Sequence, residues 1–151
     1  MYSKEELKNL KIEFWEGFDN YCRTQSYLQG RDKMWVLYDT KVKNVELKFD
    51  ATRDGASVIL EICHRSDDAR LEMFERITWH KATLEQDLGD ELIWDLTYTR
   101  DTGKQVCRIY CFCDGLDIHR RAHWDGFYEY MARKMFLLER NFMEIRDYLQ
   151  D

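Results

Sequence analysis

The last third of the chain is an uninterrupted amphipathic segment. From Asp117 to Leu149 it contains no proline and a single glycine, Gly126. Large apolar residues recur there every three or four positions: Trp124, Phe127, Met131, Met135, Leu138, Phe142, Ile145 and Leu149. This spacing predicts one long α-helix with a continuous apolar stripe. A helix of about thirty residues spans roughly 45 Å. Since a small core does not need that length, we expect a packing spine or a partner surface.

The composition describes a globular chain with an acidic balance. The 151 residues suit a single domain over residues 1–151, and a hydrophobic content of 44% excludes a disordered chain. Twenty-three basic and twenty-nine acidic residues give a formal net charge of -6, which disfavours general binding to nucleic-acid phosphates. We expect no membrane segment, because no apolar run is long enough and the start of the chain is polar. Five cysteines are an odd number for a disulfide framework, so we expect a reduced, cytoplasmic protein.

The N-terminal region predicts a helix followed by a loop. Ser3 and Glu6 form the Ser-x-x-Glu pattern of a capping box, in which each side chain bonds an unpaired backbone amide. Apolar residues at helical spacing follow as far as Cys22. We therefore expect a helix from about Lys4 to Cys22 and a polar loop over residues 25–33.

Two segments with alternating apolar and polar residues predict β-hairpins. The first covers residues 45–62 and has an Asp-Gly turn within residues 52–55. The second covers residues 92–113, with its turn at residues 100–103. The apolar run at residues 34–38 predicts one further strand before the first hairpin.

A helix is predicted between the two hairpins. Ser66 is a suitable N-terminal cap, apolar residues recur at helical spacing as far as Leu88, and Gly89 stands where a C-terminal cap glycine belongs. Hairpins imply antiparallel pairing, so we predict an α+β fold: an antiparallel sheet built from two hairpins and flanked by three helices, including the long C-terminal helix. The order of the strands is left open.

A basic and aromatic cluster precedes the apolar stripe, consisting of His119, Arg120, Arg121, His123 and Trp124. Such a cluster at a helix N-terminus suits an anion, and basic side chains with an aromatic neighbour are typical of single-strand nucleic-acid binding. The two histidines, with Asp117 or Asp125, are a weaker candidate for a metal site, because the two arginines between them would repel a cation. A solvated helix start without any ligand is the third interpretation.

Three cysteines share one face of the last predicted strand, namely Cys107, Cys111 and Cys113. Structural zinc sites usually need four ligands on tight turns, with paired Cys-x-x-Cys knuckles. We therefore expect these cysteines to be small buried core residues and not metal ligands, with a redox role as the alternative.

Glu46 and Lys48 form a Glu-x-Lys pair on a predicted strand, with Asp39 upstream. In magnesium-dependent nucleases of the restriction-endonuclease type, carboxylates bind the metal and the lysine orients the attacking water. Alternating charges on the solvent face of an antiparallel strand produce the same pattern without a function. No nucleophile elbow, phosphate-binding loop or dinucleotide fingerprint appears, so we assign no catalytic residue, metal or cofactor.

Three stretches resemble a bacterial family, the domain of unknown function 4268 (DUF4268). They are the Phe-Trp-Glu-Gly-Phe run at residues 14–18, the block from Leu84 to Trp94, and the start of the last helix around Trp124. The resemblance covers most of the chain and implies an α+β layout. Members often follow a nuclease-like region that this sequence lacks, so the resemblance implies a link to nucleic-acid handling without locating a site.

Two functional hypotheses from different classes follow. The first is a non-enzymatic accessory or interaction domain that forms a homodimer through the C-terminal helix, because a second apolar set lies on other faces of that helix: Tyr130, Phe136, Leu137 and Tyr148. A monomer, in which the first helix and the sheet bury all of these residues, is the competing interpretation of the same pattern. The alternative is a nucleic-acid-associated protein. It would be either a binder that uses the basic cluster or a magnesium-dependent nuclease that uses the Glu-x-Lys pair.

Overall fold

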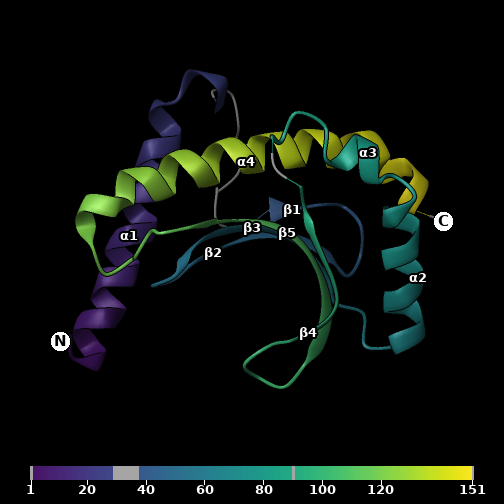
Figure 1. The fold of residues 1–151 in the computed structure, drawn as a ribbon, viewed down its shortest axis with the longest axis horizontal. Coiled ribbons are helices and arrows are strands. Elements are labelled where there is room, and N and C mark those ends of the chain that lie inside the picture. The colour runs from purple at the N-terminus through teal and green to yellow at the C-terminus, as the bar shows by residue number, and fades with distance from the viewer. Residues whose placement is uncertain (1, 29–37, 90, 151) are drawn as a thin grey trace.

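The computed structural model describes residues 2–28, 38–89 and 91–150 (Figure 1). The strands are β1 (Tyr38–Asp39), β2 (Val45–Ala51), β3 (Gly55–Ile62), β4 (Ile93–Thr99) and β5 (Gln105–Asp114). The α-helices are α1 (Lys4–Thr24), α2 (Asp67–Thr78), α3 (Lys81–Leu84) and α4 (Trp124–Ile145). The short 3₁₀ turns are η1 (Ser26–Leu28), η2 (Arg121–His123) and η3 (Arg146–Leu149).

All pairings between the described strands are antiparallel, and the strand order is β1-β2-β3-β5-β4. Both predicted hairpins are confirmed, as β2–β3 and β4–β5. The pairing of β3 with β5 joins them, with Gly55 opposite Asp114 at one end and Ile62 opposite Cys107 at the other. Of the strand predicted at 34–38, only Tyr38 lies within the described residues.

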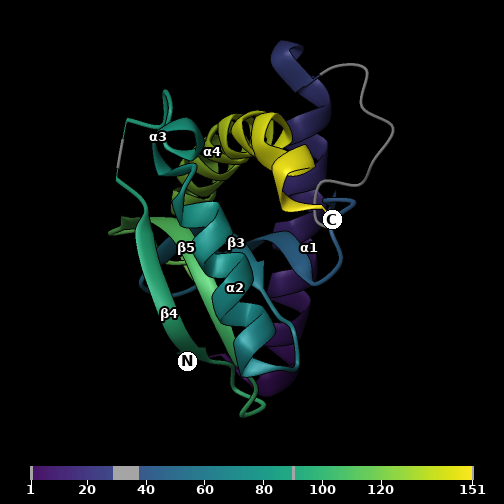
Figure 2. The same ribbon diagram turned by 90° about the vertical axis from the view of Figure 1, so that its right-hand side faces the viewer.

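The helices cover one face of the curved sheet. Figures 1 and 2 show α4 lying across the convex side and α2 packed beside the half that contains β5 and β4. The predicted α+β fold with a long C-terminal helix is therefore confirmed. The opposite, concave face has no helix on it among the described residues, and the tip of the β4–β5 hairpin curls beneath it (Figure 1).

The middle helix differs from its prediction. It ends at Thr78, and α3 begins only at Lys81. The backbone leaves the α region at His80, with φ -108° and ψ 24°, and the His80 amide bonds the Ile77 carbonyl three residues back. That shorter bond tightens and ends the turn. The predicted helix extending to residue 88 is therefore wrong in this part, and Trp79 stands at the break.

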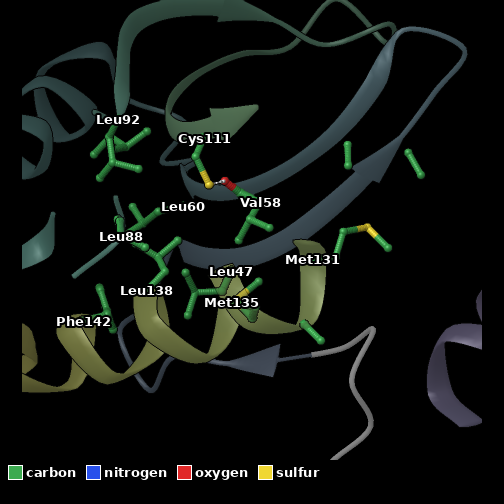
Figure 3. Packing of buried hydrophobic residues seen from close by; sticks show 14 of the residues in the cluster. Leu47, Val58, Leu60, Leu88, Leu92, Cys111, Met131, Met135, Leu138 and Phe142 are labelled. Carbon is green, nitrogen blue, oxygen red and sulfur yellow. Dashed lines mark hydrogen bonds between the residues drawn. The ribbon is translucent and has the colours of Figure 1, made fainter. Parts of the chain in front are cut away.

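The apolar stripe of the C-terminal segment forms the centre of the core. Figure 3 shows Met131, Met135, Leu138 and Phe142 of α4 directed at apolar side chains of the sheet such as Leu60. All eight residues of the predicted stripe are buried. The helix itself starts at Trp124 and not near Asp117, because residues 121–123 form the 3₁₀ turn η2.

The N-terminal helix crosses the start of α4 through aromatic contacts. Phe14 makes an edge-to-face contact with Trp124 at 5.3 Å and lies 5.1 Å from the Tyr128 ring. The Tyr128 hydroxyl donates a hydrogen bond of 2.7 Å to the Phe14 carbonyl oxygen, and burial raises the pKa of Tyr128 to about 12. Gly17 allows this approach, because a Cβ there would overlap the hydroxyl. The contact therefore fixes the angle between the two helices.

Candidate functional site

Four charged residues form a row across the helix-free face of the sheet. The strand register places Glu46 opposite Glu61, Glu61 opposite Arg108, and Arg108 opposite Asp95. The Glu61 side chain is 0% exposed. A buried ionised carboxylate is stable only when it is paired and hydrogen-bonded, so its neighbours decide what this face can do.

Three cations surround the Glu61 carboxylate. Arg108 donates through Nε to Oε1 at 2.8 Å, and Lys48 donates through Nζ to Oε2 at 2.8 Å. Arg100 reaches the same Oε2 from the β4–β5 hairpin. Arg100 and Lys48 also contact Glu46, at 3.5 and 3.3 Å. We call these five residues the Glu61 network, and it fastens the curled hairpin tip to β2 and β3.

The pKa of Glu61 reflects two opposing effects. Burial raises the pKa, but the hydrogen bonds from Arg100, Lys48 and Arg108 outweigh it and hold the pKa below its ordinary value. The hydrogen bond to Glu61 correspondingly raises the pKa of Arg100. Both shifts favour the charged forms of Glu61 and Arg100, so this ion pair is retained at neutral pH.

The predicted Glu-x-Lys pair belongs to this network. Glu46 and Lys48 lie on the same sheet face, and the register places the backbone of Asp39 opposite Glu46. The Asp39 side chain lies outside what the structure describes. Among the described residues no group of three histidine, cysteine or acidic side chains is suited to a metal ion. Three adjacent cations would also repel Mg²⁺, so this geometry favours a structural role.

The basic cluster is held mainly by acidic and backbone partners. Arg121 pairs with Glu13, and Arg120 Nε lies 3.8 Å from Asp117 Oδ2. The Asp117 amide donates to His123 Nδ1 at 3.0 Å, and the His119 amide donates to Asp117 Oδ1 at 2.9 Å. The cluster directly precedes α4, with His123 as the N-cap residue and Trp124 as the first residue of that helix. Binding of an anion or a nucleic acid by this cluster stays a prediction.

Trp124 does not offer a stacking surface. Its side chain is 9% exposed, packs against Phe14 and donates from Nε1 to the Ile118 carbonyl oxygen at 2.7 Å. Arg121 stacks over the Trp124 ring at 4.8 Å and covers it further. The tryptophan therefore anchors the turn before α4.

The cysteines of β5 behave mainly as core residues. Cys107 and Cys111 are buried, and Cys113 is intermediate. The Cys111 thiol points toward the Val58 carbonyl oxygen on β3, as Figure 3 shows. The Cys107 thiol donates to the Leu96 carbonyl oxygen at 3.2 Å, so both thiols lie within the sheet.

An exposed apolar groove lies between α2 and β4 and was not anticipated from the sequence. We call it the α2–β4 groove. It is lined by Leu71, Phe74, Glu75, Thr78, Trp79 and Leu96. Its volume is about 530 Å³. Trp79 is 87% exposed, whereas Leu71 and Leu96 are 42% and 43% exposed. Figure 2 shows α2 running beside the half of the sheet that ends in β4. Phe74 closes the floor by contacting Trp94 edge-to-face at 5.9 Å.

A sequence signal for this groove exists but is weak. Leu71 belongs to the apolar pattern that predicted the middle helix, and such spacing cannot tell a half-exposed position from a buried one. Trp79 is exposed because the helix ends at Thr78, which the periodicity did not reveal. Leu96 is exposed because β4 is an outer strand of the sheet.

The sequence model described as domain of unknown function (DUF4268) matches residues 10–146. The chain belongs to the DUF4268 family. No curated protein and no solved structure matches it. Among the described residues no helix of this DUF4268 protein has the length and apolar character needed to cross a membrane. Two of the stretches that carried the resemblance meet in the core, since Phe14 packs on Trp124.

Proposed function

We propose that this DUF4268 domain is a non-enzymatic interaction domain that binds another protein through the α2–β4 groove. The observation that carries the proposal is the 87% exposure of Trp79 beside two half-exposed leucines. Single exposed apolar side chains are ordinary, but a contiguous apolar patch around a groove is typical of a binding surface. Tryptophan is also enriched among the residues that dominate binding energy at interfaces.

The groove combines a firm floor with an open rim. Phe74 is packed against Trp94 and the core, so the floor exists before any partner arrives. Burying a large apolar side chain contributes roughly 1.5–3 kcal/mol. Trp79 with Leu71 and Leu96 can therefore supply several kilocalories per mole toward the cost of association, and the remaining contacts of the partner supply the rest.

Self-association through α4 stays a prediction, and the packing of the second apolar set gives it little support. Of the second apolar set, Tyr130, Phe136 and Leu137 are partly buried against the core of the same chain. Tyr148 is 70% exposed and lies at the end of η3, where its ring is 5.2 Å from that of His80. The exposed apolar surface near the C-terminus is thus close to Trp79, so we place the protein-binding surface on α2 and β4.

Nucleic-acid binding and magnesium-dependent cleavage also stay untested hypotheses. The geometry gives them less support than the groove does. Arg120 and Arg121 face acidic partners, Trp124 is buried, and Lys48 is committed to Glu61. Binding to phosphates would have to break those contacts first.

Site-specific photo-crosslinking in the native cell tests the proposed function. A photoreactive phenylalanine analogue replaces Trp79 or Leu96 in the groove, or Ile12 on the exposed side of α1 as the matched control. We expect one dominant crosslinked partner from both groove positions and none from position 12. Equal crosslinking at all three positions, or none in the groove, would contradict the proposal.

A further inference from the structure

We infer that the α2–β4 groove binds a peptide segment in which large apolar side chains are flanked by lysine or arginine. This inference rests on the proposed function and names the chemistry of the partner. The apolar part follows from the lining, in which Glu75 is the one charged residue. The basic part follows from the charges around that lining.

The exposed face of α2 is acidic on both sides of Leu71. Asp68 precedes Leu71 by three residues and Glu75 follows it by four, so helical geometry places all three on one face. No salt bridge to another described residue involves Asp68 or Glu75. The cations of α2 are already used, because Arg70 pairs with Asp67 and bonds the His64 carbonyl oxygen, and Arg76 pairs with Glu72. The rim therefore has unmatched negative charge that a basic partner would complement.

The same charges argue against a second copy of this chain as the occupant. A two-fold interface through this groove would bring two copies of the same patch together, so the acidic rims of both copies would lie in one interface. Like charges brought together at an interface cost several kilocalories per mole, and the chain carries a net charge of -6. A basic segment has the opposite effect, since it is attracted to this surface.

The edge of β4 limits how the segment can bind. As the outer strand, β4 could extend the sheet by pairing with a peptide backbone. However, its register against β5 shifts between Asp95 and Tyr98, which inserts a bulge at Leu96 and Thr97. Bulges interrupt a regular edge. The apolar side chains of the segment, inserted between Trp79 and Leu96, therefore supply most of the affinity.

Selection from a phage library of random dodecapeptides tests the inference. The intact protein serves as bait, and the Trp79→Ala variant removes clones that do not need the groove. We expect enriched peptides with a large apolar residue next to lysine or arginine. A synthetic peptide of that sequence should bind Trp79→Ala at least about tenfold more weakly, as for a hot-spot residue. Ile12→Ala is the matched control and should leave the affinity unchanged.

The charge requirement has its own test. Glu75→Lys should weaken the selected peptide about fivefold, whereas Glu16→Lys on the exposed side of α1 should change binding by less than about twofold. Enrichment of acidic peptides, or equal binding to Glu75→Lys, would overturn the inference and leave the proposed function standing. Loss of a concentration-dependent dimer in Trp79→Ala, with no peptide enriched, would make a second copy the occupant. If no peptide is enriched and no crosslink forms in the groove, the proposed function is contradicted as well.

Discussion

The Glu61 network and the α2–β4 groove lie on opposite faces of the sheet and use their side chains in opposite ways. In the network a buried carboxylate is matched by three cations from β2, β5 and the hairpin end. In the groove Trp79 and two leucines remain exposed to solvent, and neither Glu75 of the lining nor Asp68 on the same face of α2 has an ion-pair partner among the described residues.

This difference indicates that the network serves the stability of the fold and that the groove serves binding. A carboxylate with no exposure and three hydrogen bonds from cations is costly to disturb and is not accessible to a ligand. An exposed tryptophan contributes little to folding, because little of its surface leaves water. We therefore expect mutations in the network to change stability and mutations in the groove to change binding.

The largest expected effect comes from Glu61→Gln. The substitution keeps the shape but removes the charge that Lys48, Arg100 and Arg108 share. Breaking a buried charge cluster costs about 3–5 kcal/mol. Urea denaturation followed by circular dichroism measures the change in the free energy of unfolding. Glu46→Gln, whose side chain is 48% exposed, is the control and should cost less than about 1 kcal/mol.

Arg100→Ala should have an intermediate effect. Glu61 keeps Lys48 and Arg108, so we expect a loss of about 1.5–3 kcal/mol, the typical value of a hydrogen bond to a charged group. Arg100 is also the contact that links the hairpin end to Glu46. Hydrogen exchange should therefore accelerate at residues 99–105. Unchanged exchange there would mean that the hairpin curls for another reason.

Protonation is a milder way to break the network. The pKa of Glu61 lies below its ordinary value of 4.5 in the folded state. A lowered folded-state pKa stabilises the protein at pH values above the unfolded-state pKa, and this stabilisation is lost as the pH falls through the folded-state pKa. Wild-type stability should thus decline below about pH 4.5, whereas Glu61→Gln should lack that part of the decline. Parallel slopes in the two proteins would contradict the assignment.

The smallest effect on stability is expected in the groove. Trp79→Phe should change the free energy of unfolding by less than about 0.5 kcal/mol, as is usual for exposed positions. Trp124→Phe makes the same chemical change in the core. It removes the hydrogen bond to the Ile118 carbonyl and should cost about 1–3 kcal/mol. Equal losses of unfolding free energy in urea denaturation would show that Trp79 is part of the core. They would contradict the distinction between an exposed groove and a buried core.

The local structure was largely predictable from the sequence. The capping box formed by Ser3 and Glu6, both hairpins and the buried stripe of α4 were all inferred correctly. Each depends on residues close together in the chain, where side-chain periodicity and turn chemistry act directly. The end of α2 was missed, because the apolar spacing continues across a break that a single backbone angle at His80 creates.

The tertiary structure decided which side chains from distant parts of the chain come into contact. Only the pairing of β3 with β5 brings Arg108 to Glu61 across 47 residues, and only the curl of the hairpin brings Arg100 to it across 39. The basic cluster was visible in the sequence, but its partner Glu13 came from α1. The sequence by itself determined which segments are helices and which are hairpins. Whether a charge is matched and whether a tryptophan is exposed depend on neighbours distant in the chain, and local patterns carry no information about those contacts.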